Sequence, residues 1–336
     1  MTTAIGCVHV PPRTLVRDRF YYGQSVAESW KRQMLLNVVR MRYADAPIFM
    51  DVTSVINSYS IAGSVNAGAI LRSEGPNDFP FGAGASFSNT PTVTYQPLTG
   101  ERFIRSMLQP IPPVALFQML QTGWSADMLL RIGVRTINGL KNATRGAAPD
   151  LTFDQLIVAV SRLQAAGGLN IRIEERKDGE GAVIALPIPP TGTTSADRAE
   201  VQRLLGLEPG ATEYSLVFGL TPRSPTEIAV LTRSMFEVLV EYGVGVDVPD
   251  ADRTEGRVTG GALPAGGTPT TRLVHVLSGT SAPSDAYAAV PYRDRWYWVA
   301  DEDLTSKVRF TLLMILSSLA ETGAAPVAPV ITVPSR

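Results

Sequence analysis

The sequence has very few of the residues on which disulfide, metal and histidine chemistry depend. It contains one cysteine, Cys7, and two histidines, His9 and His275, among 336 residues. A single cysteine excludes an intrachain disulfide, and no cluster of His, Cys and carboxylate residues has the spacing of a metal site. We therefore expect no disulfide, no metal centre of this kind and no cofactor.

Charged residues are also scarce, and their signs nearly balance. They make up 18% of the chain against 45% hydrophobic residues, the formal net charge is −1, and no dense block of Lys and Arg occurs. This composition favours a folded protein and argues against a nucleic-acid partner, which usually requires a basic stripe. The most apolar helix candidate, residues 310–319, is too short to cross a bilayer.

Residues 59–97 carry the clearest pattern in the chain. Odd positions are mostly apolar and even positions are mostly Ser, Gly, Asn or Thr in the segments 59–71, 79–88 and 93–97. Because side chains of a strand alternate between its two faces, this pattern predicts an antiparallel meander of two or three strands, joined by turns at SEGPND and SNTP. Its apolar face would lie against the protein's own core or against lipid.

Helical and strand-like patterns alternate along the rest of the chain, which predicts the α+β class, with an N-terminal helix and meander followed by a mixed α+β domain. Predicted helices cover residues 25–43, 100–108, 114–120, 125–140, 152–166, 195–205, 225–242 and 304–320. Predicted strands outside the meander cover residues 48–57, 169–175, 182–187, 214–218, 273–277, 286–290 and 296–299.

Changes in composition predict the domain organisation. Residues 1–24 would form a lipobox-like N-terminus and tether, 25–145 a domain of helix, meander and short helices, and 146–324 the α+β domain. A Gly- and Pro-rich stretch at 249–271 is predicted to be a mobile loop, and 325–336 a C-terminal tail.

Residues 3–7, Thr-Ala-Ile-Gly-Cys, resemble the end of a bacterial lipobox, in which small and aliphatic residues precede Gly-Cys. Cys7 would then be the lipid attachment site. The charged and apolar regions of a signal peptide do not precede it in this sequence. The alternative is a chance Gly-Cys pair in a tail.

Three longer stretches, at residues 28–55, 91–113 and 292–323, are similar to a family of uncharacterised proteobacterial predicted outer-membrane lipoproteins. In that family a lipobox precedes a helix of the form SWxxQxLLNIVxxRY and a strand beginning PxFxDV. The matching positions are Ser29, Trp30, Gln33, Leu35, Leu36, Asn37, Arg42, Tyr43, Pro47, Phe49, Asp51 and Val52. The resemblance implies an envelope location and a lipid on Cys7, and it implies no activity.

Candidate catalytic and binding residues are isolated. His275 lies in RLVHVL, where the apolar neighbours predict a buried strand position, and nearby Ser278 and Ser281 are too little for a Ser–His site. Asp301, Glu302 and Asp303 could bind calcium, although acidic residues also favour the start of the last helix.

Two further motifs have ordinary structural explanations. Residues 82–86, GAGAS, lie within the alternating segment and lack the Lys and helix of a phosphate loop. Trp296, Tyr297 and Trp298 could form a sugar-stacking platform, but packing beneath the last helix is the commoner explanation.

We therefore expect a non-catalytic cell-envelope lipoprotein of the periplasm or outer membrane that acts by binding or assembly. Its partners would be the membrane, through lipid on Cys7, and other envelope proteins or further copies of itself. One alternative is an oligomeric outer-membrane channel component in which residues 59–97 contribute strands to a shared barrel. A hydrolase acting on the cell wall is a third.

Overall fold

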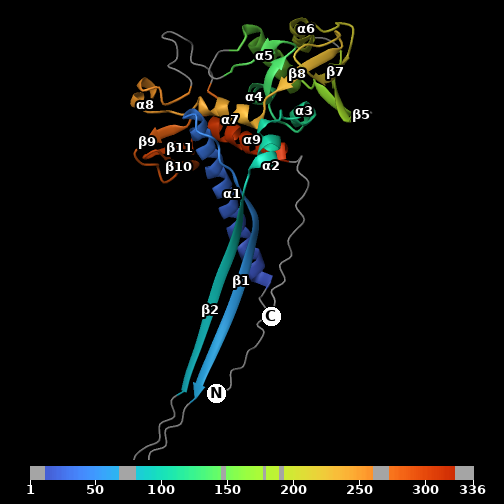
Figure 1. The fold of residues 1–336 in the computed structure, drawn as a ribbon. Helices are drawn as coiled ribbons and strands as arrows, with labels where there is room; N and C mark the ends of the chain where they lie inside the picture. The colour runs from blue at the N-terminus through green and yellow to red at the C-terminus, as the bar shows by residue number, and fades with distance from the viewer. Residues whose placement is uncertain are drawn as a thin grey trace, which may run out of the picture. The chain divides into compact units, whose positions relative to one another are not determined.

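The computed structural model describes residues 12–67, 81–144, 149–176, 179–188, 193–259 and 272–321. They form helices and mixed sheets, which confirms the predicted α+β class (Figure 1). The chain divides into two units, Met1–Trp30 with Ile48–Leu98, and Lys31–Pro47 with Thr99–Arg336. Cys7, His9 and the predicted C-terminal tail lie outside the described residues. No helix within the described ranges is long and apolar enough to span a membrane.

Helix α1 (Pro12–Arg42) begins well before the predicted start at residue 25. Proline suits the first position of a helix, because its fixed φ is already helical and its missing N–H has no partner to lose there. Half of the predicted tether is therefore helical.

The predicted meander is a single antiparallel hairpin of two long strands, β1 (Met50–Ala67) and β2 (Phe81–Pro97). The strand predicted at 48–57 is continuous with the first meander strand, and the segment SNTP lies inside β2 instead of forming a turn. Pro91 of that segment pairs with Asn57. Proline is tolerated at the edge of a sheet, and both strands of a two-stranded sheet are edges.

The register of the hairpin keeps the sequence alternation in phase across both strands. From Val55↔Val93 to Ala67↔Phe81, odd-numbered residues pair with odd-numbered residues, and directly opposed residues share a face. The register shifts between Val52 and Ser54, so that Val52 pairs with Tyr95. This bulge transfers the even-numbered Val52 to the face that the odd-numbered residues occupy beyond it.

The six-stranded sheet crosses the predicted domain boundary after residue 145. Its strand order is β4-β3-β8-β7-β6-β5, with all neighbours antiparallel except the parallel pair β7–β8. The strands are β3 (Val134–Ile137), β4 (Leu140–Lys141), β5 (Asn170–Arg176), β6 (Gly179–Ala185), β7 (Glu213–Phe218) and β8 (Glu227–Thr232). Because β3 pairs with β8, residues on the two sides of that boundary belong to one sheet.

Two of the predicted helices are part strand. The segment predicted as helix 125–140 is helix α4 (Ala126–Gly133) followed by the β3–β4 hairpin, whose turn residues Asn138 and Gly139 have φ values of 45° and 83°. Asn-Gly favours such a two-residue turn because both positions need positive φ. The segment predicted as helix 225–242 is β8 followed by helix α7 (Met235–Gly243).

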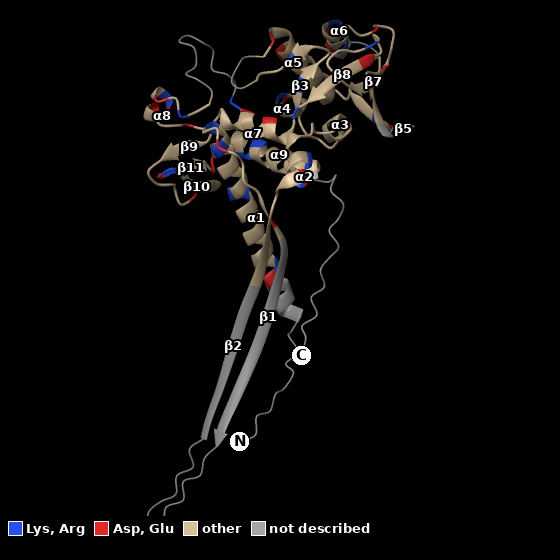
Figure 2. Ribbon diagram, viewed as in Figure 1, with Lys and Arg blue, Asp and Glu red and all other residues tan. Residues whose placement is uncertain are grey.

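The other predicted helices agree closely in position with the structure. They are α2 (Gly100–Phe103) with the π-helical turn η1 (Ile104–Leu108), α3 (Pro113–Gln121), α5 (Leu151–Ala165), α6 (Thr193–Leu205) and α9 (Leu304–Glu321). Helix α8 (Asp250–Thr254) lies within the predicted mobile loop. The acidic residues of its first turn, Asp250 and Asp252, favour a helix start there. Acidic and basic residues occur together on α2 and α8 (Figure 2).

A second sheet has the order β10-β11-β9, with β9 (Leu277–Gly279), β10 (Ala288–Tyr292) and β11 (Arg295–Val299). In β11, Tyr297 and Val299 are fully buried, whereas Trp296 is 36% exposed. The face of β11 that enters the core is therefore the one with Tyr297 and Val299, and Trp296 and Trp298 on the opposite face are less buried.

The hydroxyl of Tyr43 joins three segments that lie far apart in sequence. It donates to Asp252 Oδ2 at 2.7 Å and lies 2.7 Å from the hydroxyl of Tyr297. The guanidinium of Arg293 lies 4.6 Å from the centre of the Tyr43 ring. Burial, and then the hydrogen bonds to Tyr297 and Asp252, raise the pKa of Tyr43 far above its ordinary value, so the phenol stays protonated.

We expect Tyr43→Phe to lower the free energy of unfolding by about 1–3 kcal/mol, because it leaves two polar partners without their shared hydrogen bond. Urea denaturation followed by circular dichroism would measure this loss. The matched control is Tyr21→Phe, since the side chain of Tyr21 is 67% exposed. Equal stability of the two variants would contradict the importance given to the Tyr43 hydroxyl.

Candidate functional site

The candidate site lies along helix α7. One face of this helix is buried, and residues on its other faces line two cavities. Its fully buried residues are Met235, Val238, Leu239 and Tyr242. Ser234 starts the helix with a capping box, in which its hydroxyl accepts from the Glu237 N–H and its own N–H donates to the Glu237 carboxylate. The cap therefore fixes both the start of the helix and the position of one acidic side chain.

The larger cavity has a volume of about 670 Å³ and a mostly apolar wall. Its lining residues come from the end of α1, from α2 and from α7, with one from the segment after α8. They are Met41, Ala44, Asp45, Ala46, Pro47, Phe103, Phe236, Val240, Val244 and Thr259. On α7 the lining positions are spaced four residues apart, which places them on one face of the helix.

The two polar side chains of this wall already have partners inside the protein. The Thr259 hydroxyl donates to the carbonyls of Met41 and Arg42 at 3.1 and 3.0 Å. The carboxylate of Asp45 accepts from the Tyr292 hydroxyl and, at 3.0 Å, from Arg293. The Tyr292 hydrogen bond, and then Arg293, hold the pKa of Asp45 below its ordinary value although partial burial opposes this.

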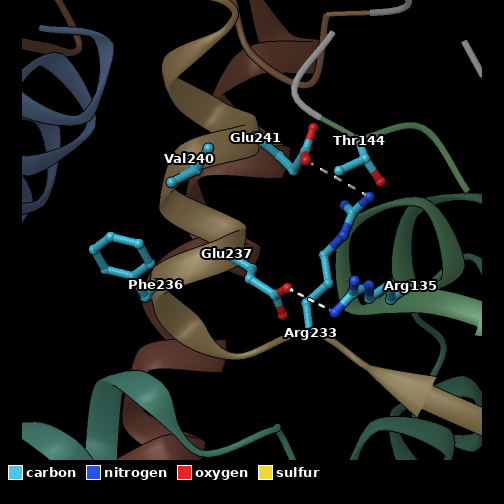
Figure 3. Close-up of a pocket in the computed structure, with 7 residues that line it drawn as sticks. All are labelled: Arg135, Thr144, Arg233, Phe236, Glu237, Val240 and Glu241. Carbon is cyan, nitrogen blue, oxygen red and sulfur yellow. Dashed lines mark hydrogen bonds and ion pairs between the residues drawn. The ribbon is translucent and has the colours of Figure 1, made fainter. Parts of the chain in front are cut away.

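The smaller cavity, of about 250 Å³, lies beside the acidic residues of the same helix (Figure 3). It is lined by Arg135, Thr144, Arg233, Phe236, Glu237, Val240 and Glu241. In Figure 3 the side chains of Phe236 and Val240 lie on one side of α7, and Glu237 and Glu241 extend toward the two arginines on the other. Phe236 and Val240 line both cavities.

Arg233 is a buried cation held by backbone carbonyls. Its side chain is 3% exposed and donates to the carbonyls of Arg131 at 2.9 Å, Ile132 at 3.2 Å and Ala143. Glu241, also buried, lies 4.0 Å away. Burial lowers the pKa of Arg233, and the charge of Glu241 opposes that shift. An arginine remains cationic under such conditions, so the pair places two opposite charges at the inner wall of the cavity.

Arg135 and Glu237 form a second ion pair that is open to solvent. Their charged groups lie 3.3 Å apart, and their side chains are 56% and 41% exposed. The cavity thus combines a fixed inner ion pair with an accessible outer pair, and it offers equal numbers of positive and negative groups.

His275 does not occupy the buried strand position predicted for it. It precedes β9, its side chain is 43% exposed, and its Nε2 lies 2.8 Å from Asp247 Oδ2. Backbone hydrogen bonds between Val276 and the segment 245–247 bring that carboxylate alongside. Among the described residues, neither Ser278 nor Ser281 hydrogen-bonds the ring, so the structure does not bring the predicted Ser–His pair together.

The acidic residues before α9 make contacts within their own segment. Asp303 accepts from the Ser306 N–H at 3.0 Å and from its hydroxyl at 2.6 Å, which caps the helix. Asp301 pairs with Lys307 at 2.6 Å. Within the part of the chain that the structure describes, no group of three or more His, Cys, Asp or Glu residues is placed to hold a metal ion.

Comparisons of this chain with protein-family models, with curated proteins and with solved structures found no match. The lipoprotein resemblance and the lipid on Cys7 therefore stay predictions.

Sequence reasoning missed the α7 site because it merged β8 and α7 into one helix. The available signal was the capping box, Ser234 followed three residues later by Glu237, which marks a helix start. The remaining wall residues come from distant segments, and no sequence spacing joins them.

We expect Arg233→Met to lower the free energy of unfolding by about 3–5 kcal/mol, because it removes the cation that faces the buried Glu241 carboxylate and that donates to three backbone carbonyls. The matched variant Arg135→Met removes an exposed pair, which contributes only about 0–1 kcal/mol. Guanidinium denaturation of both variants would measure the difference. Similar losses in the two variants would show that Arg233 is no more important to the fold than a surface arginine.

Proposed function

We propose that this protein is a non-catalytic lipoprotein of the bacterial cell envelope that acts by assembly, and that copies pair through the β1–β2 hairpin. The observation that supports assembly is the hairpin's pair of long, almost uncharged edges. Its strands have 18 and 17 residues, and in the described structure they form a sheet of two strands only.

Open sheet edges are normally protected against pairing with other chains. Soluble proteins keep their edge strands short or place lysines, other charges, prolines or bulges on them. Here the two strands contain a single charged residue, Asp51, one bulge near the base of the hairpin, and besides Pro97 at the end of β2 a single proline, Pro91. Beyond the bulge, from Val55 and Val93 onward, the rows of backbone N–H and C=O groups along both outer edges are therefore suited to pairing with another strand.

A second copy of the chain is the partner that this geometry favours. A hairpin of two strands is marginally stable in water, and added strands stabilise it. The β2 edge of one copy can pair antiparallel with the β1 edge of the next, as the strands do within the hairpin. Because this contact joins two different edges, each copy can bind a further copy in the same way. The series closes into a ring if the rotation between neighbouring copies adds up to a full turn.

A more specific candidate function is a ring of hairpins that forms a shared barrel across the outer membrane. The in-phase register supports it, since apolar positions fall on one face and small polar positions on the other. A tilted membrane strand needs about 9–11 residues, which β1 and β2 exceed.

The envelope location is supported by the Gly-Cys motif and by the family resemblance. We expect the full-length product, expressed in a bacterium, to partition into the detergent phase, and Cys7→Ser to shift it to the aqueous phase or block its processing, because the lipid would be the anchor. Phase partitioning with immunodetection would measure this. Continued partitioning of Cys7→Ser into detergent would contradict lipid anchoring through Cys7.

Pairing between copies is testable with single cysteines in a Cys7→Ser background. A variant with Ser60→Cys in β1 is mixed with variants that carry one cysteine in β2, beginning at Ser88→Cys, and is treated with a short thiol crosslinker. We expect crosslinked dimers that join β1 to β2, strongest for a few neighbouring β2 positions, because strand pairing fixes a register.

The matched control for this experiment is Thr254→Cys on α8, where the side chain is exposed. Crosslinking no stronger than this control would refute pairing between hairpins. Crosslinks only between two β1 positions would instead indicate a two-fold dimer, and would exclude the ring and the shared barrel.

A further inference from the structure

We propose that the two cavities along α7 together form a binding site for a single-chain amphiphile with a zwitterionic head, one phosphate and one ammonium group. The hydrocarbon chain would occupy the larger cavity and the head the smaller one. This inference concerns ligand binding and does not depend on assembly through the hairpin or on the lipid at Cys7.

The chemistry of the larger cavity fits a hydrocarbon chain. Eight of the ten described residues that line it are apolar, and its volume of about 670 Å³ lies within the range of small-molecule sites, about 300–1,000 Å³. The two polar side chains, Asp45 and Thr259, are satisfied by partners inside the protein. A ligand that enters this cavity therefore gains apolar contact and breaks no polar interaction of the wall.

The charges of the smaller cavity are complementary to a zwitterion. Arg135 and Arg233 face Glu237 and Glu241, so the four charges sum to zero and form two ion pairs, with nitrogen–oxygen distances of 3.3 and 4.0 Å. A purely anionic or cationic head would meet repulsion from two of them, whereas a head with both charges can address both signs. Arginine forms paired hydrogen bonds to phosphate, which favours a phosphate as the anionic group.

The inner and outer ion pairs would have different roles. The inner pair is buried and held by backbone carbonyls, so it sets the local field without moving. The outer pair, Arg135 and Glu237, is exposed, and exposed pairs open at low cost. Arg135 can then turn to the phosphate. Glu237 keeps its place in the capping box through Oε2, and its Oε1, released by Arg135, can accept from the ammonium, while the ring of Phe236 offers a cation–π surface.

The head and the chain of one molecule can reach both cavities because the cavities share part of their wall. Phe236 and Val240 line each of them, and both side chains are partly exposed along α7. Val244 extends the apolar side of this shared wall by another turn and lines only the larger cavity. Because Val244 lines only the larger cavity and Arg135 only the smaller one, the two cavities can be tested separately.

The experiment uses the purified full chain and isothermal titration below the micelle-forming concentration. The probe is myristoyl lysophosphatidylcholine. It is compared with myristate, which has the same chain but a simple carboxylate as its head, and with glycerophosphocholine, which has the zwitterionic head and no chain. We expect saturable binding of the lysolipid at one molecule per chain, binding of myristate about tenfold weaker, and no detectable binding of glycerophosphocholine.

Two variants separate the compartments, each with a matched control on the surface. Val244→Arg should reduce the affinity for both lysolipid and myristate by more than about tenfold, whereas Val158→Arg, at an exposed valine of α5, should leave both unchanged. Arg135→Gln should reduce the affinity for lysolipid about tenfold and not that for myristate. Arg172→Gln, which removes the exposed pair with Glu213, should have no effect.

Several results would overturn the proposal. They are non-saturable partitioning of the lysolipid, equal affinity for myristate and lysolipid, or equal effects of Val244→Arg and Val158→Arg. Circular dichroism spectra and thermal midpoints of every variant would identify one that fails to fold. If Val244→Arg unfolds, Val244→Gln provides the test of the chain compartment, because it adds a polar group without a charge.

Discussion

The hydroxyl of Tyr43 is the contact on which much of the second unit depends. It joins the residue after α1 to Asp252 of α8 and to Tyr297 of β11. Asp45, two residues further along the chain, repeats this pattern with Tyr292 and Arg293 of the β10–β11 hairpin. These hydrogen bonds fix the course of residues 41–47, which form much of the wall of the larger cavity. A polar cluster of few residues therefore determines the position of an apolar surface.

Helix α7 shows how one short element can serve several purposes through its period. Residues three and four apart lie on one face of a helix, so nine residues provide a buried face, an acidic edge and an apolar edge. The buried face includes Val238 and Leu239, the acidic edge Glu237 and Glu241, and the apolar edge Val240. Because the Ser234 cap sets where the helix begins, it also sets which residues reach each cavity.

Sequence periodicity predicted the elements that are long and regular, and it failed where short elements of different type adjoin. The hairpin, the helix 152–166 and the final helix each repeat one period over many residues, and the structure has all three. The segments 125–140 and 225–242 each contain a helix and a strand of fewer than ten residues. A sequence window long enough to reveal a period therefore averages over the helix and the strand in each segment. The α7 site escaped prediction for a different reason, since its walls meet only through long-range packing.

The bulge near the base of the hairpin gives a reason to regard the alternation as a requirement of the fold. Without the shift between Val52 and Ser54, Met50 and Val52 would lie on the small polar face. The extra residue moves them to the face of Val93 and Tyr95, so apolar positions share one face to the end of the strands. A bulge interrupts the ladder and leaves one residue unpaired. Its presence is understandable if the apolar face must be continuous over its whole length. Pairing of strands between copies would require such a continuous face, because an apolar residue on the polar face of one copy would occur in every other copy as well.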